Sequence, residues 1–497
     1  MAHMPVVSSA DHGLFASAFG TVGDGVKDDT VALQEAITAS PGRILRLRKG
    51  TYRVTSTLQI SSRLQRIAGE LCARGSAGGT EITFSGSGPL FQIGTDNGAA
   101  WDASYYDGPQ DTFFEDIWLS HAAPATPLAM GIGTYAANCY GIRDWRGGPI
   151  RLNRVGIEKF EYNYWGIQSD INRFEDLISL YSKYGLYAGP RSDQFTIRSL
   201  YSFYCDQAFI VDQARQVRLY DSEIVNCGTS SVCPVEIRKG TGSTRIHNCW
   251  FEHHEGPGNN YAGHISVGMV NGYSSAGPMT KTTPAQFVTV ADAMFYNPNA
   301  TVGNVGHVRC LVQLGAATGV RVIRPAHMMG GSFSDLDHII EAPSGTAYTS
   351  AEAQATIEGV PQSLLAVNAD KLFKNNGTGT PDFTARVDQN SAVGQIANRH
   401  YFYRAGAAAG AESWFISTEG TPGAVYWHAP TYPTTGQKNR LKLTRAIQYS
   451  TAAPTAGTWE RGDIVLNETP SAGGFVGWVC VTSGTPGGWQ TFGVIST

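Results

Sequence analysis

The segment NCWFEHHEG, residues 248 to 256, places two aromatic residues, two histidines and two glutamates within nine positions. Only 16% of the residues in the chain are charged, so this density of ionisable groups stands out. Histidine and glutamate can transfer protons, and two carboxyl groups on opposite sides of a glycosidic bond can cleave it. The same residues could instead form the polar end of a strand, held in hydrogen bonds along a stack of strands.

The neighbouring repeats can be aligned with this segment on the assumption that Leu219 and Ile246 both point into the core. In that alignment further acids and aromatic residues lie beside the segment. The expected neighbours are Asp221 with Asn248, Glu223 with Trp250, Asn226 with His253, Tyr181 and Tyr201 with Glu223, and Tyr184 and Tyr204 with His253. We therefore expect one face that combines an aromatic floor with acids, a composition suited to holding and cutting sugar chains.

Hydrolysis is the reaction that this face favours. Glu223 and Glu252 are the first candidate pair of carboxyl groups, and Asp221 and Asp206 are the substitutes. An aromatic neighbour raises the pKa of an acid, and Trp250 falls next to Glu223. Neighbouring strands can hold two carboxyl groups at the separations of both retaining and inverting enzymes, so the stereochemistry stays open. The residues expected to bind the sugar are Tyr181, Tyr184, Tyr201, Tyr204, Trp250 and Arg198.

Elimination is the alternative chemistry. In a polymer of uronic acid, a base removes the proton beside the carboxylate while a cation neutralises that carboxylate. His253 or Tyr204 would be the base, and the cation would come from Lys183, Arg198, Arg218 or Arg245. The sequence has no EF-hand loop, so no cofactor or metal is expected, with calcium as an open alternative. A non-catalytic adhesin that only holds the polymer on this face is the third interpretation.

Repeated segments must position these residues. Alternating apolar and polar residues recur, and the strand starts at Leu152, Phe174, Phe195 and Val217 lie 22, 21 and 22 residues apart. A period of this length is typical of stacked coils of parallel strands. Cys205 and Cys227, also 22 residues apart, would stack as small buried side chains. The sequence therefore predicts an all-β fold, a parallel β-helix.

The chain divides into four expected parts. Residues 1–13 look like a tag and a truncated linker, 14–60 a cap, and 61–345 the catalytic parallel β-helix. The cap should contain a helix that begins at Asp28, Asp29 and Thr30 and buries Val31, Leu33 and Ile37. From about residue 345 the chain becomes rich in Ser, Thr, Gly, Ala and Asn, which marks a boundary. Residues 346–497 should form a β-rich module for trimerisation or carbohydrate binding, with Trp459, Trp478 and Trp489.

Composition excludes several classes of partner. The net charge is −4 and like charges form no runs, so neither nucleic acid nor anionic lipid is expected to bind. No stretch approaches the roughly 18 apolar residues of a membrane span. The eight cysteines contain no Cys-x-x-Cys pair and are expected to be reduced and mostly buried.

Two segments resemble a known family. FGTVGDGVKDDT (19–30), followed by a helix, a Gly-Thr-Tyr strand and irregular coils, resembles the pectate-lyase-type right-handed β-helix of bacteriophage tailspikes and related polysaccharide enzymes. The ending GDIVLNETPSAGGFVGWVCVTSGTPGGWQTFG (462–493) is similar to a carboxyl-terminal module frequent in the same proteins. The resemblance spans most of residues 14–345 and 455–497. It specifies the fold better than the reaction, since the superfamily includes hydrolases, lyases, epimerases and esterases.

The resemblance implies a phage tailspike depolymerase. Such a protein would be a homotrimer on the virion tail, hence extracellular, joined to the virion baseplate through an N-terminal part missing from this chain. It would bind and cleave a bacterial surface polysaccharide: capsule, O-antigen or exopolysaccharide. A secreted pectinase or epimerase is a further alternative, which a monomeric mass in solution would favour.

Overall fold

The computed structural model describes residues 13–61, 65–94, 111–129, 131–145, 147–229, 232–238, 241–252, 263–269, 285–296, 308–315, 317–327, 336–342, 353–358, 373–375, 382–386, 399–404, 413–417, 425–428, 440–443 and 448–497. The chain folds as two compact units. The first comprises Met1–Arg386 with Arg404–Gly406, and the second comprises Val387–Tyr403 with Ala407–Thr497.

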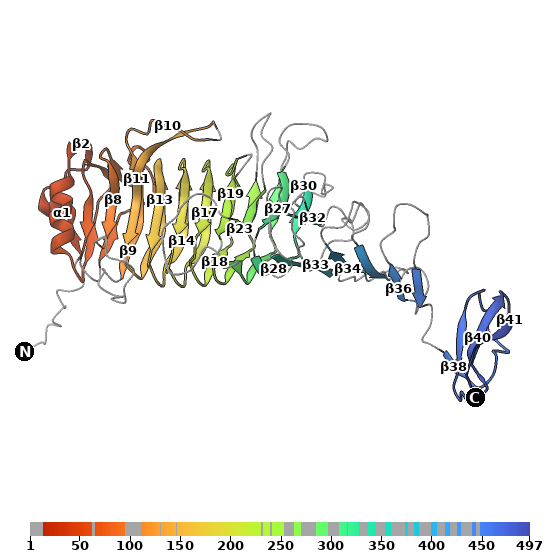
Figure 1. Cartoon of the computed structure of the whole chain (residues 1–497). Coiled ribbons are helices and arrows are strands. Elements are labelled where there is room, and N and C mark those ends of the chain that lie inside the picture. The colour runs from red at the N-terminus through yellow and green to blue at the C-terminus, as the bar shows by residue number, and fades with distance from the viewer. Residues whose placement is uncertain are drawn as a thin grey trace, which may run out of the picture. The chain divides into compact units, whose positions relative to one another are not determined.

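The first unit is a right-handed parallel β-helix, as the sequence predicts (Figure 1). Each coil contributes strands to two sheets, which we call sheet A and sheet B. Each strand pairs in parallel with the equivalent strand of the next coil. Sheet A contains β1 (Leu14–Phe15), β2 (Asp24–Asp28), β3 (Ile44–Arg46), β4 (Gly50–Val54), β6 (Arg66–Ala68), β7 (Thr80–Phe84), β9 (Thr112–His121), β12 (Ile150–Glu158), β14 (Arg173–Leu180), β16 (Thr196–Phe203), β18 (Val217–Tyr220), β19 (Glu223–Val225), β21 (Thr244–His247), β22 (Trp250–Glu252), β24 (Ala285–Gln286), β25 (Val288–Ala291), β26 (Met294–Tyr296), β28 (Ala317–Ile323), β29 (Ala326–His327), β31 (Ala353–Glu358) and β33 (Asp382–Arg386).

Sheet B forms the second wall of the coils. It contains β5 (Leu58–Ile60), β8 (Gly88–Ile93), β11 (Thr134–Trp145), β13 (Phe160–Ile167), β15 (Tyr184–Ala188), β17 (Gln207–Val211), β20 (Val235–Arg238), β23 (Ile265–Met269), β27 (Val308–Leu314), β30 (Leu336–Ala342) and β32 (Phe373–Asn375). The short β10 (Thr126–Pro127) pairs antiparallel with β11. Parallel pairing continues past residue 345, through β31 and β33, so the coil strands extend further along the chain than the expected boundary.

Sheet A bends at a residue that adopts a left-handed backbone conformation in successive coils. Asp176, Ser199, Asp221 and Asn248 occupy this position, with φ between 50° and 55°. Such values are uncommon for residues other than glycine, and their recurrence shows that the bend is a fixed feature of the coil. The strand residues before and after the bend therefore present their outward side chains on two adjoining faces.

The register confirms one sequence alignment and corrects another. Leu219 pairs with Ile246, as expected. Phe174 pairs with Ile197, however, and not with Phe195. The expected register is wrong by two residues, because Phe195 and Ile197 are both buried and either fits the alternation. The chain from Ala188 to Thr196 is also one residue longer than the chain between their partners in the preceding coil.

Apolar side chains and small thiols fill the interior of the coils. The backbone N–H of Cys205 donates to the sulfur of Cys227 at 3.4 Å, so the expected cysteine pair does stack. Cys249 lies beside Ser222 in another column, because Glu223 pairs with Trp250. All eight cysteines are free, and all except Cys72 are buried, which confirms that they are mostly buried.

The amino-terminal end of the stack is covered by α1 (Thr30–Ala39) (Figure 1). The 3₁₀ turn η2 (Ala16–Phe19) precedes α1, and η3 (Gly75–Ala77) lies between β6 and β7. Leu33 and Ile37 of α1 are buried as expected, but Val31 is 71% exposed and Ala36 is buried in its place. The predicted apolar stripe is wrong at Val31 because the buried residues recur three and four apart from Leu33. The Asp29 carboxylate accepts hydrogen bonds from the backbone N–H groups of Val22 and Gly23, which precede β2, and its side chain makes no capping hydrogen bond to the helix.

The second unit contains two small sheets. In the first, β34 (Arg399–Arg404), β35 (Ser413–Ser417), β36 (Val425–His428) and β37 (Arg440–Leu443) pair antiparallel. In the second, β38 (Gln448–Ser450), β39 (Ile464–Asn467), β40 (Phe475–Thr482) and β41 (Gly488–Val494) form one sheet. Trp459 and Trp478 are buried in its core, and Trp489 packs against them, so these tryptophans hold the module together.

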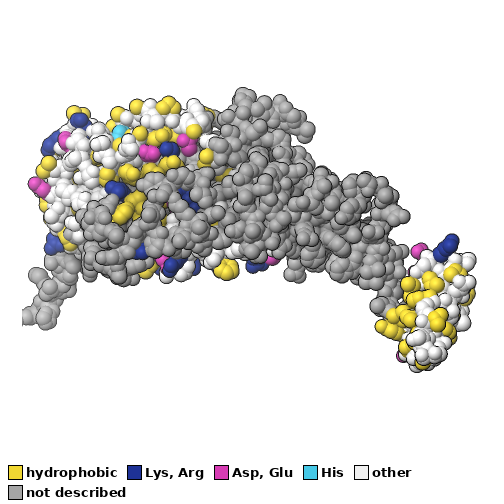
Figure 2. Space-filling view, in the orientation of Figure 1, with side chains coloured by type: hydrophobic (Ala, Val, Ile, Leu, Met, Phe, Trp, Pro, Cys, Tyr) yellow, Lys and Arg dark blue, Asp and Glu magenta, His cyan; other side chains and the backbone are white. Residues whose placement is uncertain are grey.

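Charged side chains are scattered among uncharged ones on the face shown in Figure 2. In the described part of the chain, no helix is both long and apolar enough to cross a membrane.

Candidate functional site

Glu223 and Glu252 project from neighbouring strands of sheet A. Glu223 pairs with Trp250 and Val225 pairs with Glu252, so the two glutamates are two residues apart in register on β19 and β22. Strand spacing and rise place their Cα atoms roughly 8 Å apart. Glutamate side chains at that separation can reach the carboxyl distances of both retaining and inverting glycosidases.

The environment distinguishes one of these acids. Burial raises the pKa of Glu223 above its usual range, and the charge of Glu252 raises it further. Both effects favour the protonated form of Glu223, as a general acid requires. Glu252 itself is only 8% exposed.

Aromatic side chains lie around the two glutamates. Tyr201 pairs with Glu223 in the register of sheet A, and burial followed by the charges of Glu223 and Glu252 raises its pKa. Trp250 lies beside Glu223 on the other side, and its buried indole N–H has no hydrogen-bond partner within the described residues.

A second aromatic group follows on the same coils. Tyr181 and Tyr204 both adopt left-handed conformations at the end of their strands, and their rings stack with centroids 5.7 Å apart. Phe203 lies against Tyr204, at 3.9 Å between centroids. Tyr181 therefore stacks with Tyr204 and not in the Glu223 column, which corrects the expected alignment.

The hairpin of β10 and β11 reaches across the coils to this group (Figure 1). The backbone N–H of Ala129 donates to a carboxylate oxygen of Asp206 at 3.1 Å. A Cβ atom at Gly133 would lie 2.6 Å from the Tyr181 ring, so the hairpin backbone packs directly on that ring. Asp206 thus fixes the hairpin beside the aromatic group, which is a positioning role.

Other expected site residues lie elsewhere. Tyr184 is on sheet B, where its ring packs on Tyr162 with centroids 4.5 Å apart, so its expected position beside His253 is wrong. Asp221 is at the bend, where it accepts a hydrogen bond from Asn248, as aligned, and pairs with Arg198 at 3.5 Å. His253 lies outside the described residues.

A second group of carboxylates, which sequence reasoning missed, lies nearer the amino-terminal end of sheet A. Glu158 is 1% exposed and pairs with Arg74 and Lys159, while Glu81 accepts hydrogen bonds from Ser120 and the backbone of Gly75. Both ion-pair partners of Glu158 are cations, so its charge is balanced. The stretch FFEDIWLS (113–120) marks the coil that contains Ser120, but no spacing in the sequence points to Arg74 as a partner of Glu158.

Within the residues that the structure describes, no group of three or more histidine, cysteine, aspartate or glutamate side chains is arranged so that it could hold a metal ion.

The comparisons with known proteins show only that the structure of this chain is similar to other structures. No protein-family model matches the chain, and no curated protein matches it. ORF18 of Geobacillus virus E2 is similar at 14% identity and a TM-score of 0.47, over 97% of this chain and 86% of that one. The adhesin PfbA of Streptococcus pneumoniae is similar at 12% identity and a TM-score of 0.49, over 82% of this chain and 100% of that one. Tailspike protein 2 of the Escherichia coli O157:H7 bacteriophage CAB120 is similar at 12% identity and a TM-score of 0.48, over 98% of this chain and 63% of that one. At such identities the likeness concerns the fold and not the chemistry.

Proposed function

We propose that this chain is a phage tailspike depolymerase that binds a bacterial surface polysaccharide and hydrolyses its glycosidic bonds on sheet A. The observation that carries the proposal is the Glu223–Glu252 pair, in which burial and a like charge raise the pKa of one acid. Two neighbouring carboxyl groups, one of which has a raised pKa, are the minimum machinery of a glycosidase.

The proposed reaction assigns one role to each acid. Glu223 donates its proton to the oxygen of the glycosidic bond as that bond breaks, and Glu252 supplies a carboxylate on the opposite side of the sugar. In a retaining reaction Glu252 attacks the anomeric carbon, and in an inverting one it takes a proton from the attacking water. Tyr201 and the Trp250 ring offer apolar faces for the sugar.

The hairpin of β10 and β11 would bound the substrate on one side. It rests on Tyr181 and is held by Asp206. A polymer lying over Tyr201 and Glu223 would therefore meet aromatic rings and a wall of backbone, which favours a single orientation of the chain in the site.

Incubating the protein with a panel of capsules, O-antigens and exopolysaccharides, and following chain length, tests the proposal. Hydrolysis shortens the polymer without unsaturated products, whereas elimination leaves an unsaturated uronide that absorbs in the ultraviolet. Shortening with that absorbance would replace hydrolysis by the lyase alternative. Binding without any shortening across the panel would indicate an adhesin.

Assembly and location belong to the same proposal. A homotrimer on the virion tail, extracellular and joined to the baseplate by a preceding segment, would present three copies of the site to the host surface. Light scattering in solution gives the number of chains directly. A mass of one chain would contradict the trimer and favour a secreted enzyme.

A further inference from the structure

Sheet A carries a column of arginines on the face that precedes the bend. The register places nine residues in one line across successive strands, and six of them are arginine. The line runs Arg66, Phe113, Arg151, Arg173, Thr196, Arg218, Arg245, Thr289 and Arg321. We call these six arginines the arginine column. At roughly 4.8 Å per strand, the column extends over about 38 Å.

The centre of the column is positively charged and unneutralised. Arg66 pairs with Glu115, Arg151 pairs with Asp111 at 3.7 Å, and Arg321 pairs with Glu358, so the two ends are balanced. In contrast, Arg173, Arg218 and Arg245 form no ion pair within the described part of the chain. A protein with a net charge of −4 therefore concentrates positive charge on one line of one face.

An aromatic side chain lies beside this central stretch. Tyr220 is two residues after Arg218 on the same strand, so both side chains point outward. The guanidinium of Arg198 lies 5.6 Å from the centroid of the Tyr220 ring, and the ring of His247 contacts it edge-on from the next strand. A row of cations with an aromatic ring beside it suits a ligand that is both anionic and ring-shaped.

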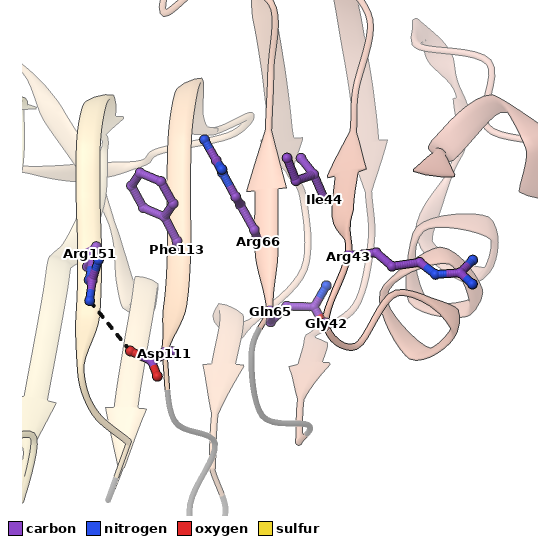
Figure 3. Close-up of a pocket in the computed structure, with 8 residues that line it drawn as sticks. All are labelled: Gly42, Arg43, Ile44, Gln65, Arg66, Asp111, Phe113 and Arg151. Atoms are coloured by element: carbon purple, nitrogen blue, oxygen red, sulfur yellow. Dashed lines mark ion pairs between the residues drawn. The ribbon is translucent and has the colours of Figure 1, made fainter. Parts of the chain in front are cut away.

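A pocket opens at the amino-terminal end of the column (Figure 3). Its volume is about 430 Å³, and Arg66 and Arg151 line it from the strands on either side of Phe113. The Arg66 guanidinium lies 4.9 Å from the centroid of the Phe113 ring. Gln65, which is fully buried, lines the same pocket, and its carbonyl oxygen has no hydrogen-bond partner among the described residues. Asp111 also lines the pocket and pairs with Arg151 at 3.7 Å, so the pocket offers an aromatic floor, two guanidinium groups that each have one acidic partner, and an unused acceptor.

We infer that the arginine column and its pocket bind one strand of an acidic polysaccharide, whose carboxylates pair with successive arginines along the axis of the β-helix. Guanidinium groups bind carboxylates in two parallel hydrogen bonds, which fixes both position and orientation. The inference rests on the proposed function and deepens it, because it names an acidic polymer as the substrate. On each coil only the bend separates the arginine face from the Glu223 face, so a bound strand lies beside the acids.

Binding of polygalacturonate, compared with dextran of the same length at low salt, tests the inference. The variant Arg173→Gln/Arg218→Gln/Arg245→Gln should bind polygalacturonate on the order of tenfold more weakly, since three exposed charge pairs are lost. The control variant Lys49→Gln/Arg53→Gln/Arg461→Gln loses the same formal charge away from the column, and it should bind as the unmodified protein does. Binding should also weaken with salt, and less steeply for the first variant.

Four results would overturn the inference. They are equal binding of the two polysaccharides, equal loss of binding in both variants, tighter binding of a single-stranded oligonucleotide of the same charge, and a change in oligomeric mass in the column variant alone. The last would assign the arginines to contacts between copies of the chain.

The test separates failure of this inference from failure of the proposed hydrolysis. Column-dependent binding of polygalacturonate without shortening of any polymer in the panel would keep the inference and contradict the hydrolase. Cleavage of neutral polymers at rates unaffected by the column variant would keep the hydrolase and contradict the inference.

Discussion

Glu223 and Glu252 face the same side of sheet A from adjacent strands, offset by two residues, and the charge of one raises the pKa of the other. The other acidic group on this sheet differs in this respect. Glu158 lies between Arg74 and Lys159, which balance its charge. Only the first arrangement favours a protonated carboxyl beside a second acid, and that asymmetry is what acid catalysis at a glycosidic bond needs.

Replacing either glutamate should abolish cleavage and spare binding. Glu223→Gln and Glu252→Gln should each lower kcat by about 10²–10⁴-fold, because each removes one half of the proton transfer or attack. The double variant should lose little more than either single variant, since the two groups act together. Glu35→Gln on the exposed side of α1 is the control and should leave turnover unchanged. Loss of less than tenfold in either single variant would move catalysis to other residues.

The pH dependence of cleavage follows from the raised pKa of Glu223. A general acid works only while protonated, so kcat/KM should fall as pH rises through the pKa of Glu223. Because that pKa is raised, the fall should come at higher pH than for an ordinary glutamate. A profile of kcat/KM against pH measures it, and an alkaline limb in the ordinary range of glutamate would contradict the assigned acid.

A methyl group on the hairpin should disturb the site through Tyr181. Gly133 and Gly131 both have left-handed conformations, with φ of 90° and 84°, so alanine at either costs about 1–2 kcal/mol of strain. Only at Gly133 would the new Cβ clash with the Tyr181 ring, because nothing lies within 4 Å of the position at Gly131. Gly133→Ala should therefore lower kcat/KM several-fold more than Gly131→Ala. Equal activities would show that the hairpin takes no part in substrate binding.

The repeat length of the sequence predicts most of the fold, but it does not predict the pairing register of every strand. Strands with one buried face repeat apolar residues at fixed positions, and this pattern correctly aligned Leu219 with Ile246 and Glu223 with Trp250. It failed at Phe195, because Phe195 and Ile197 lie two residues apart and are both buried, so alternation alone does not show which of them pairs with Phe174. Coil length is set by loops, and loops vary freely in length.

The site was predictable only along the strands. Neighbours such as Tyr201 and Glu223 follow from register alone. Tyr184 was misplaced because the chain turns after Tyr181 onto sheet B, and the left-handed turn residue there is a tyrosine, which carries no turn signal. The contact of Ala129 with Asp206 joins residues 77 apart in the sequence, and no periodicity could reveal it.

A buried aspartate should make stability fall as pH rises. Burial raises the pKa of Asp144 to about 7, although Ser169 and Tyr164 donate hydrogen bonds to it. Between about pH 4 and pH 7 the unfolded chain loses this proton and the folded chain keeps it, so the free energy of unfolding decreases with pH. Asp144→Asn cannot ionise, so its stability relative to the unmodified protein should rise from pH 4 to pH 8, by at most about 4 kcal/mol. Thermal unfolding at both pH values measures the difference.

The control for this experiment is Asp24→Asn. Backbone hydrogen bonds from Lys27 and Val26 lower the pKa of Asp24, so its contribution is present above the ordinary aspartate pKa and is lost as pH falls. The pH dependence of this variant should have the opposite sign and lie below about pH 4, so its stability relative to the unmodified protein should change little between pH 4 and pH 8. A parallel response of the two variants would show that Asp144 is not the group that titrates.

Breaking a buried charge network on sheet B should cost far more than breaking an exposed pair on sheet A. Arg238 is 7% exposed and donates to Glu236 at 2.9 Å and to Asp212 at 3.0 Å, and both carboxylates are buried. Arg238→Met leaves them without a cation, which should lower the free energy of unfolding by about 3–5 kcal/mol. Arg154→Met removes a pair with Asp116 in which the arginine is 49% exposed, and should cost about 1 kcal/mol or less. Chemical denaturation of the two variants compares the costs directly, and similar midpoints would mean that water or other groups already balance the charges of Glu236 and Asp212.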